Sequence, residues 1–264
     1  MGSLKQASGN INGGLKITGN LDAPSVRGDI NFNQAAFNIA MLDSYYRINK
    51  ESISFTSEGI RFDTFALIDS AGNQATVDGM IYTTNFTDYR FGLDVTTDNF
   101  KAVSSTQKDN KLFYGDVFLS SNLRIRGDMN SPKVDGNVTI NDKTSFTVVL
   151  PQSDPGIIER EGVVQFVDMD DPESVNALTS GFDTLNTSDI TGMDVALNIE
   201  VDSNAVFNII IDQGTGDFLR VQGDAELTAG IDPSGKVNMT GTFLLTKGAY
   251  ELSFNLLRRR FELQ

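Results

Sequence analysis

The chain contains the segment Leu15-Lys-Ile-Thr-Gly19-Asn-Leu21-Asp-Ala-Pro24-Ser-Val26-Arg-Gly28-Asp-Ile30, and the same pattern returns as Leu123-Arg-Ile-Arg-Gly127-Asp-Met129-Asn-Ser-Pro132-Lys-Val134-Asp-Gly136-Asn-Val138. Gly19, Pro24 and Gly28 each have a counterpart 108 positions later. In both copies apolar and polar residues alternate, turn over a proline, and resume the alternation in the same phase. This pattern predicts two antiparallel strands joined by a short turn, with one apolar face.

Alternation with a period of two continues through most of the chain. Tyr89, Phe91, Leu93 and Val95 form one example, and a longer one runs from Leu219 to Ile231. The turns between these segments are rich in Gly, Asn, Asp and Ser, and no segment has a clear helical period. We therefore expect an all-β protein with roughly 16 to 20 short strands, most of them antiparallel, in one long sheet.

Several glycines fall on the apolar phase, where a side chain would normally pack. They are Gly19, Gly28, Gly127, Gly136, Gly223 and Gly241. At such positions a strand bends sharply or approaches another backbone closely. We therefore expect the sheet to fold lengthwise into a half-pipe, or β-taco, with an apolar concave face and the glycines at its crease.

We expect residues 1–264 to form a single domain, because no linker is long enough to separate independent units. The internal repeat covers residues 15–30 and 123–138. An acidic segment at about 169–190 has no clear period and is predicted to be a mobile loop. The first residues, Met1-Gly-Ser, are typical of an expression start, so we expect a native export signal or anchor to precede them.

Composition excludes several classes of function. The 21 Lys and Arg against 35 Asp and Glu give a net charge of −14, which disfavours binding to nucleic acid. The chain contains no Cys and no His, so cysteine nucleophiles, serine–histidine relays and histidine-bound metals are excluded. We expect no enzyme activity, no cofactor and no resident metal.

An ordered set of motifs resembles the C-terminal domain of TamB, in its Bacteroidetes type, over nearly the whole chain. Besides the repeat, the set comprises Asp69-Ser-Ala-Gly72-Asn73-Gln-Ala-Thr-Val-Asp-Gly79, Phe113-Tyr-Gly115, Glu161-Gly-Val-Val-Gln-Phe166, Gly230-Ile-Asp-Pro-Ser-Gly235, Lys247-Gly-Ala-Tyr250-Glu-Leu-Ser-Phe254 and Arg258-Arg-Arg-Phe261. The resemblance implies an AsmA-like protein of the periplasm, anchored in the inner membrane and reaching the outer membrane. It also implies a β-taco that conducts phospholipids between the two membranes and works with an outer-membrane assembly barrel, TamA or a related protein.

We expect the apolar face to bind phospholipid acyl chains, with head groups left in water at the open seam. Burial of each methylene is worth about 0.8 kcal/mol, so a tail of roughly 14 to 16 carbons gains on the order of 10 kcal/mol. The predicted lining consists of Leu15, Ile17, Leu21, Val26, Ile30, Phe32, Leu93, Val95, Leu123, Ile125, Val134, Val138, Val195, Leu197, Ile199, Ile209, Leu227 and Phe243.

Other interpretations of the same patterns remain open. The apolar face could close on itself as a sandwich core, and the alternation would also suit an outer-membrane β-barrel or a structural β-solenoid of the cell surface. Among possible sites, Asp168–Glu173 could bind Ca²⁺, and carboxylate pairs such as Asp94 with Asp98 or Asp135 with Asp142 could cleave glycosides. The basic run Arg258–Arg260 could contact lipid phosphate or an acidic partner surface, although a solvated strand explains it equally well.

Overall fold

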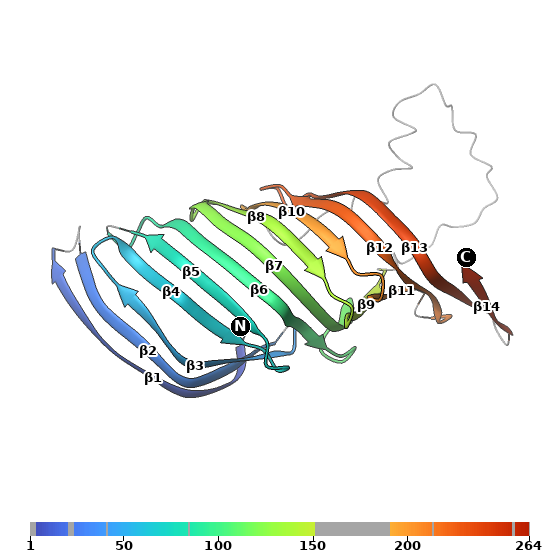
Figure 1. Ribbon diagram of the computed structural model, residues 1–264, viewed down its shortest axis with the longest axis horizontal. Helices are drawn as coiled ribbons and strands as arrows, with labels where there is room; N and C mark the ends of the chain where they lie inside the picture. Colours follow the sequence, from blue (N-terminus) through green and yellow to red (C-terminus); the bar gives the residue numbers. More distant parts are fainter. Residues whose placement is uncertain are drawn as a thin grey trace, which may run out of the picture.

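The computed structural model describes residues 4–20, 24–40, 42–83, 85–150, 191–212, 214–254 and 257–263. These residues form fourteen strands and no helix (Figure 1). The strands are Leu4–Gly19 (β1), Pro24–Ile39 (β2), Ser44–Phe55 (β3), Gly59–Ile68 (β4), Gln74–Tyr82 (β5), Arg90–Ser105 (β6), Phe113–Asp128 (β7), Ser131–Ile140 (β8), Ser145–Val149 (β9), Asp194–Val201 (β10), Val206–Asp212 (β11), Asp217–Ile231 (β12), Val237–Phe254 (β13) and Leu257–Leu263 (β14). The all-β prediction is confirmed, with several strands longer than expected.

All fourteen strands belong to one sheet. Its order is β1-β2-β3-β4-β5-β6-β7-β8-β10-β12-β11-β9. In addition, β13 pairs with β12, and β14 pairs with β13. Pairing is antiparallel except between β8 and β10 and between β9 and β11. The predicted antiparallel-rich sheet is therefore confirmed.

The two copies of the repeat form hairpins with the same register. In β1–β2, Leu15 lies opposite Gly28 and Ile17 lies opposite Val26. In β7–β8, the counterparts Leu123 and Ile125 lie opposite Gly136 and Val134. Equal spacing of glycine and proline in the sequence has thus produced equal pairing of the strands.

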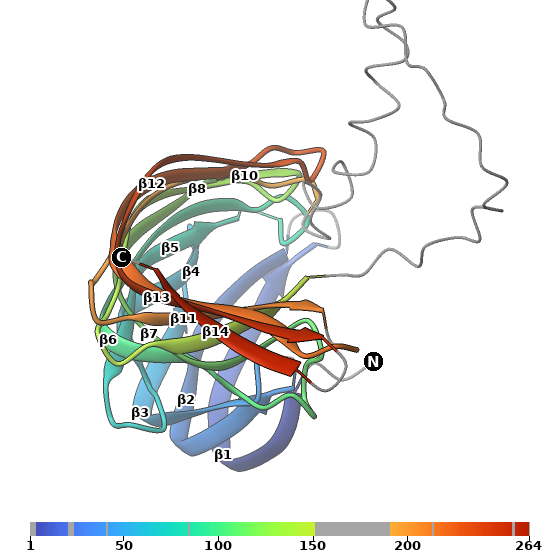
Figure 2. The same cartoon turned by 90° about the vertical axis from the view of Figure 1, so that its right-hand side faces the viewer.

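Seen end-on, the long strands curve from one lip of the molecule through a bend to the other lip, and the sheet is an open trough (Figure 2). This shape is consistent with the expected half-pipe. The bend passes through bulges in β2, β4 and β6. At each bulge the strand has one residue more than the strand paired with it, which is β1, β5 or β7. The bulge residues Gln34, Thr64 and Asn99 have positive φ of 51°, 48° and 47°. Farther along, the turns 141–144 and 202–205 separate β8 from β9 and β10 from β11.

The expectation that glycines form the crease is wrong for Gly28 and Gly136. Gly28 and Gly136 lie several residues from the bend, with φ of 137° and 154°. A Cβ on either glycine would collide with a carbonyl oxygen of the neighbouring strand, that of Gly14 or of Asn122. These glycines therefore permit close backbone approach within a hairpin, and bulges and turns make the bend.

Within the described residues, many of the buried apolar side chains gather in three small clusters. One contains Ala35, Ile48 and Phe65, the second Tyr46, Ala75 and Phe100, and the third Val201, Ala205 and Ala225. Several of these residues adjoin the bulges and turns of the bend. Side chains on the inside of a bend are pushed together, so their position indicates that the sheet is concave toward its apolar face.

Asp69 closes a gap in the sheet where the β4–β5 hairpin ends between β3 and β6. Its carboxylate is fully buried and accepts hydrogen bonds from the backbone N–H groups of Ala71, Asn73 and Lys101, the last at 2.5 Å. Beyond this hairpin, β3 and β6 meet directly, and the Tyr46 hydroxyl donates to the Ala102 carbonyl at 2.8 Å. Buried side-chain hydrogen bonds thus replace a missing ladder.

The predicted mobile loop at 169–190 lies outside the described residues. Within the residues described, no helix is long and apolar enough to cross a membrane.

Candidate functional site

One row of small and apolar residues crosses eleven neighbouring strands of the sheet, from β1 to β13. In register, its members are Gly13, Ile30, Ile53, Phe62, Gly79, Leu93, Ile125, Val134, Val195, Ile231 and Val237. Strands in a sheet lie about 4.8 Å apart, so the row is on the order of 50 Å long. Five of the predicted lining residues lie in it: Ile30, Leu93, Ile125, Val134 and Val195.

Two further rows run beside the first on the same face. One joins Val95, Leu123 and Leu197 through Gly136 and continues to Ala229 and Met239. The other joins Val138, Ile199 and Leu227 and continues to Gly241. The register therefore brings eleven of the predicted residues into three adjacent rows on one face.

The remaining predicted residues lie toward the ends or on the second half of the bent strands. Leu15, Ile17, Val26 and Phe32 lie in the β1–β2 hairpin. Phe243 lies opposite Ala225 on β12, and Ile209 lies between Val148 and Leu219 on the far side of the bend. Leu21 lies outside the described residues.

The accessibility of these side chains bears on whether the face is sealed. Of the seventeen described lining residues, only Leu93 is buried, at 8% exposure. Leu15, Ile17 and Phe243 are 43%, 70% and 40% exposed, and the other thirteen are half-buried. A sandwich core buries such side chains almost completely. This face is instead apolar and partly open to solvent.

The sequence prediction missed most of the apolar face that lies beyond the bend, where it named Ile209. In β2 the apolar positions are even-numbered up to Phe32 and odd-numbered from Ala35, and in β6 they change from odd to even between Val95 and Phe100. An extra bulge residue keeps both sets on one face while reversing the phase in the sequence. The positive φ at Gln34 and Asn99 cannot be read from the sequence. The change of phase in the alternation can be read there, and it was the signal that could have located the bend.

The opposite face is polar and carries cross-strand ion pairs. Arg126 Nη2 lies 2.7 Å from Asp94 Oδ1, and Arg124 pairs with Asp135. Two of the carboxylates considered for glycoside cleavage are therefore occupied by guanidinium groups on an exposed sheet surface, where such pairs are common.

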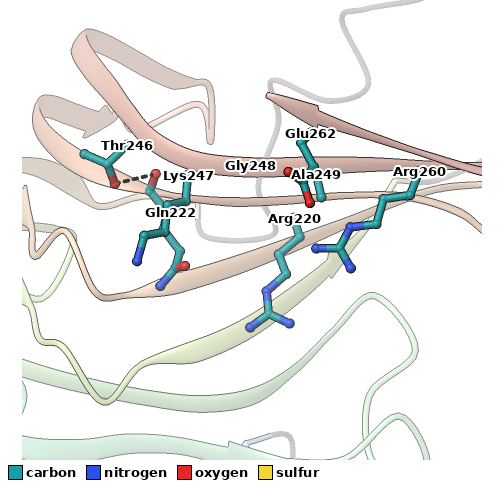
Figure 3. A pocket seen from close by; sticks show the side chains of 8 residues that line it. All are labelled: Arg220, Gln222, Thr246, Lys247, Gly248, Ala249, Arg260 and Glu262. Atoms are coloured by element: carbon teal, nitrogen blue, oxygen red, sulfur yellow. Dashed lines mark hydrogen bonds between the residues drawn. The ribbon is translucent and has the colours of Figure 1, made fainter. Parts of the chain in front are cut away.

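A hollow of about 580 Å³ lies on this polar face, over β12, β13 and β14 (Figure 3). Arg220, Lys247 and Arg260 reach it together with Glu262, so its charges are mixed. Arg260 lies 4.0 Å from Glu251, a cross-strand pair on a solvated strand. The side chain of Arg258 lies outside the described set. The charged side chains around this hollow make it a poor site for a hydrocarbon chain.

No group of three acidic residues that could hold a metal ion occurs among the described residues. The calcium site considered at Asp168–Glu173 lies in the range that the structure does not describe. The extended apolar face is therefore the candidate site that the described geometry supports.

A comparison of the sequence with protein-family models gave one match. The model of the TamB C-terminal domain matches residues 63–264, about three quarters of the chain. The first copy of the repeat precedes the matched range. Comparisons with curated proteins and with solved structures gave no match.

Proposed function

Because the chain belongs to the TamB C-terminal domain family, we propose that its apolar trough binds phospholipid acyl chains and lets them move along the sheet between the inner and outer membranes. Family membership connects the chain with the translocation and assembly module, with lipid transport and with the cell envelope. Acyl-chain binding by this face is the specific step that we add.

The observation that carries the proposal is the row of small and apolar residues across eleven strands, in which every side chain except that of Leu93 is only half-buried. Soluble proteins rarely expose a contiguous apolar surface of this extent unless something apolar covers it. A hydrocarbon chain removes the cost of exposure without needing specific polar contacts. At about 0.8 kcal/mol per methylene, partitioning alone gives substantial affinity.

The same geometry favours low selectivity for the head group. Neighbouring strands repeat every ~4.8 Å and present chemically similar side chains, so an acyl chain meets many near-equivalent positions along the rows. Its head group would remain in water at the open side of the trough. We therefore expect lipids with different head groups to bind with similar affinity.

The family is associated with a TamA-type component of the outer membrane, and this association supports a partner at the outer-membrane side. We propose that the full-length protein is anchored in the inner membrane, lies in the periplasm and delivers lipid toward that partner. The apolar rows stay accessible toward both β1 and β13, where Ile17 is 70% and Met239 58% exposed, and this supports movement of an acyl chain along them.

Leu197→Asp tests the proposal, because Leu197 lies in the second apolar row in the middle of the trough. A carboxylate there would have to be desolvated beside the acyl chain, at a cost of several kcal/mol, so lipid recovery should fall at least about tenfold. The measurement is mass spectrometry of lipid extracted from protein purified without detergent.

Asn198→Asp is the matched control, because it adds the same charge to the next residue of β10, on the polar face. It removes only the exposed hydrogen bond between the Asn198 and Asn137 amides. Lipid recovery should stay at the wild-type level. Equal lipid content in wild type and in folded Leu197→Asp would refute acyl-chain binding in this trough.

A further inference from the structure

The apolar face is not equally accessible along its length. Over β2 to β6, six rings gather in what we call the aromatic cluster: Phe32, Phe37, Tyr46, Phe62, Phe65 and Phe100. Phe65 packs edge-on against Phe32 and Phe62, with ring centroids 5.5 and 5.9 Å apart, and Tyr46 stacks on Phe100 at 5.4 Å. Phe65, Tyr46 and Phe100 are only 6%, 4% and 6% exposed.

The bend is lined differently over β8 to β12. The buried residues there are Val201, Ala205 and Ala225, and Gly223 adjoins them. Around them Leu227 is only half-buried, and on β13 Met239 is 58% exposed. Rings occur in this half as well, because Phe207 packs against the small residues and Phe113 lies 5.9 Å from Phe146, but these three rings are only half-buried. The trough therefore has a floor of closely packed, buried rings in its first half and a more open floor in its second half.

The aromatic cluster is held in place by polar contacts as well as by packing. The Tyr46 hydroxyl donates to the Ala102 carbonyl, and the Ser44 hydroxyl donates to the same carbonyl at 3.1 Å. The buried carboxylate of Asp69 fixes the adjacent backbone at Lys101. Moving the Tyr46 ring aside would break its buried hydrogen bond, and the Ser44 and Asp69 contacts hold the backbone beside Tyr46 and Phe100, so this part of the cluster is a fixed feature of the floor.

We infer that the aromatic cluster is a step that divides the trough, and that an acyl chain lies mainly in the segment from β7 to β13. This inference rests on the proposed lipid-binding function. The five strands β7, β8, β10, β12 and β13 span about 19 Å at ~4.8 Å per strand. An acyl tail covers about half of a ~30 Å bilayer core, or roughly 15 Å, so the segment accommodates one tail lengthwise.

The test maps where lipid contacts the protein. Vesicles of phosphatidylethanolamine and phosphatidylglycerol, with a trace of phosphatidylethanolamine bearing a diazirine in its acyl chain, are incubated with the chain and irradiated. Cross-linked peptides are then identified by mass spectrometry. In wild type, labelling around Leu123, Leu197 and Leu227 should exceed labelling around Ile48 and Ala75 several-fold.

Removing the ring of Phe65, which packs against both Phe32 and Phe62, should extend the lipid path. Phe65→Ala should raise labelling of the β2–β6 segment several-fold and leave labelling of β7–β13 unchanged. Phe65→Leu, which keeps more of the packing, should act in the same direction to a smaller extent. Phe91→Ala is the matched control, because this half-buried ring lies on β6 outside the cluster.

The outcomes distinguish the aromatic step from the proposed lipid binding. Equal labelling of both segments in wild type overturns the step while leaving lipid binding intact, and so does unchanged labelling in folded Phe65→Leu. No labelling above that of a protein without an apolar trough rejects the proposed function, and the step with it. Selective labelling of β7–β13 that spreads when Phe65 is reduced in size supports both.

Discussion

At the scale of single residues, Tyr46 combines burial, stacking and a hydrogen bond in one side chain. Burial raises the pKa of the Tyr46 hydroxyl above its ordinary value of 10.0, the nearby Asp69 carboxylate raises it further, and a hydrogen bond with Ser44 lowers it in part. The neutral hydroxyl is thus the form that the folded protein holds. Its hydrogen bond to Ala102 depends on that proton.

Tyr46→Phe should lower the free energy of unfolding by about 1 kcal/mol at neutral pH, through loss of the Tyr46–Ala102 hydrogen bond. Because the folded-state pKa is raised, the contribution of this hydroxyl is complete below pH 10 and is lost as the pH rises through the folded-state pKa. Urea unfolding of both proteins from pH 7 to pH 11 measures the effect. A stability difference that stays constant across this range would contradict the role given to the hydroxyl.

At the scale of elements, the two hairpins of the repeat have the same register but different surroundings. β7 is paired with β6 on its other edge, whereas β1 pairs only with β2 among the described strands. Gly28 and Gly136 occupy equivalent positions, each close to a carbonyl oxygen across its hairpin. Replacing each glycine by alanine creates the same local strain in both hairpins. A difference in the loss of stability therefore reports how rigidly the neighbouring strand is held.

Gly136→Ala should cost about 2 to 3 kcal/mol, because the new Cβ meets the Asn122 carbonyl of a strand held on both sides and φ is unfavourable for alanine. Gly28→Ala should cost about 1 kcal/mol, since the edge strand β1 can move away. Urea midpoints of the two variants provide the comparison. A larger loss for Gly28→Ala than for Gly136→Ala would show that β1 is as tightly held as β7.

At the scale of the whole molecule, the described residues form one bent sheet whose buried apolar side chains lie in local clusters, with no continuous core among them. Every residue of β1 is exposed, while Leu93 on β6 and Ser121 on β7 are buried. Strands at the centre of the sheet gain from two ladders and from the clusters, and an edge strand gains from one ladder. Opening should therefore begin at the ends of the trough.

Backbone amides of β1 should exchange with deuterium roughly a hundredfold or more faster than those of β6 and β7, because their opening requires less of the structure to unfold. Hydrogen-exchange mass spectrometry of the chain at several protein concentrations measures this directly. Strong protection of β1 that increases with concentration would instead indicate that a second copy covers this edge.

The sequence by itself determined the fold class, the register of the repeated hairpins and which side chains share a face within each regularly alternating segment. Alternation fixes which side chains share a face of a strand, and the spacing of glycine and proline fixes where a hairpin turns, so both are local properties. For this reason the alternation alone assigns residues such as Ile30, Leu123 and Leu197 to the lining. The family resemblance rests on the same local motifs.

Only the tertiary structure decided where the sheet bends and how deep the trough is along its length. A bulge at Gln34, Thr64 or Asn99 adds one residue and reverses the phase, and its conformation is set by the neighbouring strand. The aromatic cluster likewise joins strands far apart in the sequence, so no local pattern contains it. Alternation shows which side chains face inward, but curvature and pairing decide which of them are covered by one another and which remain open.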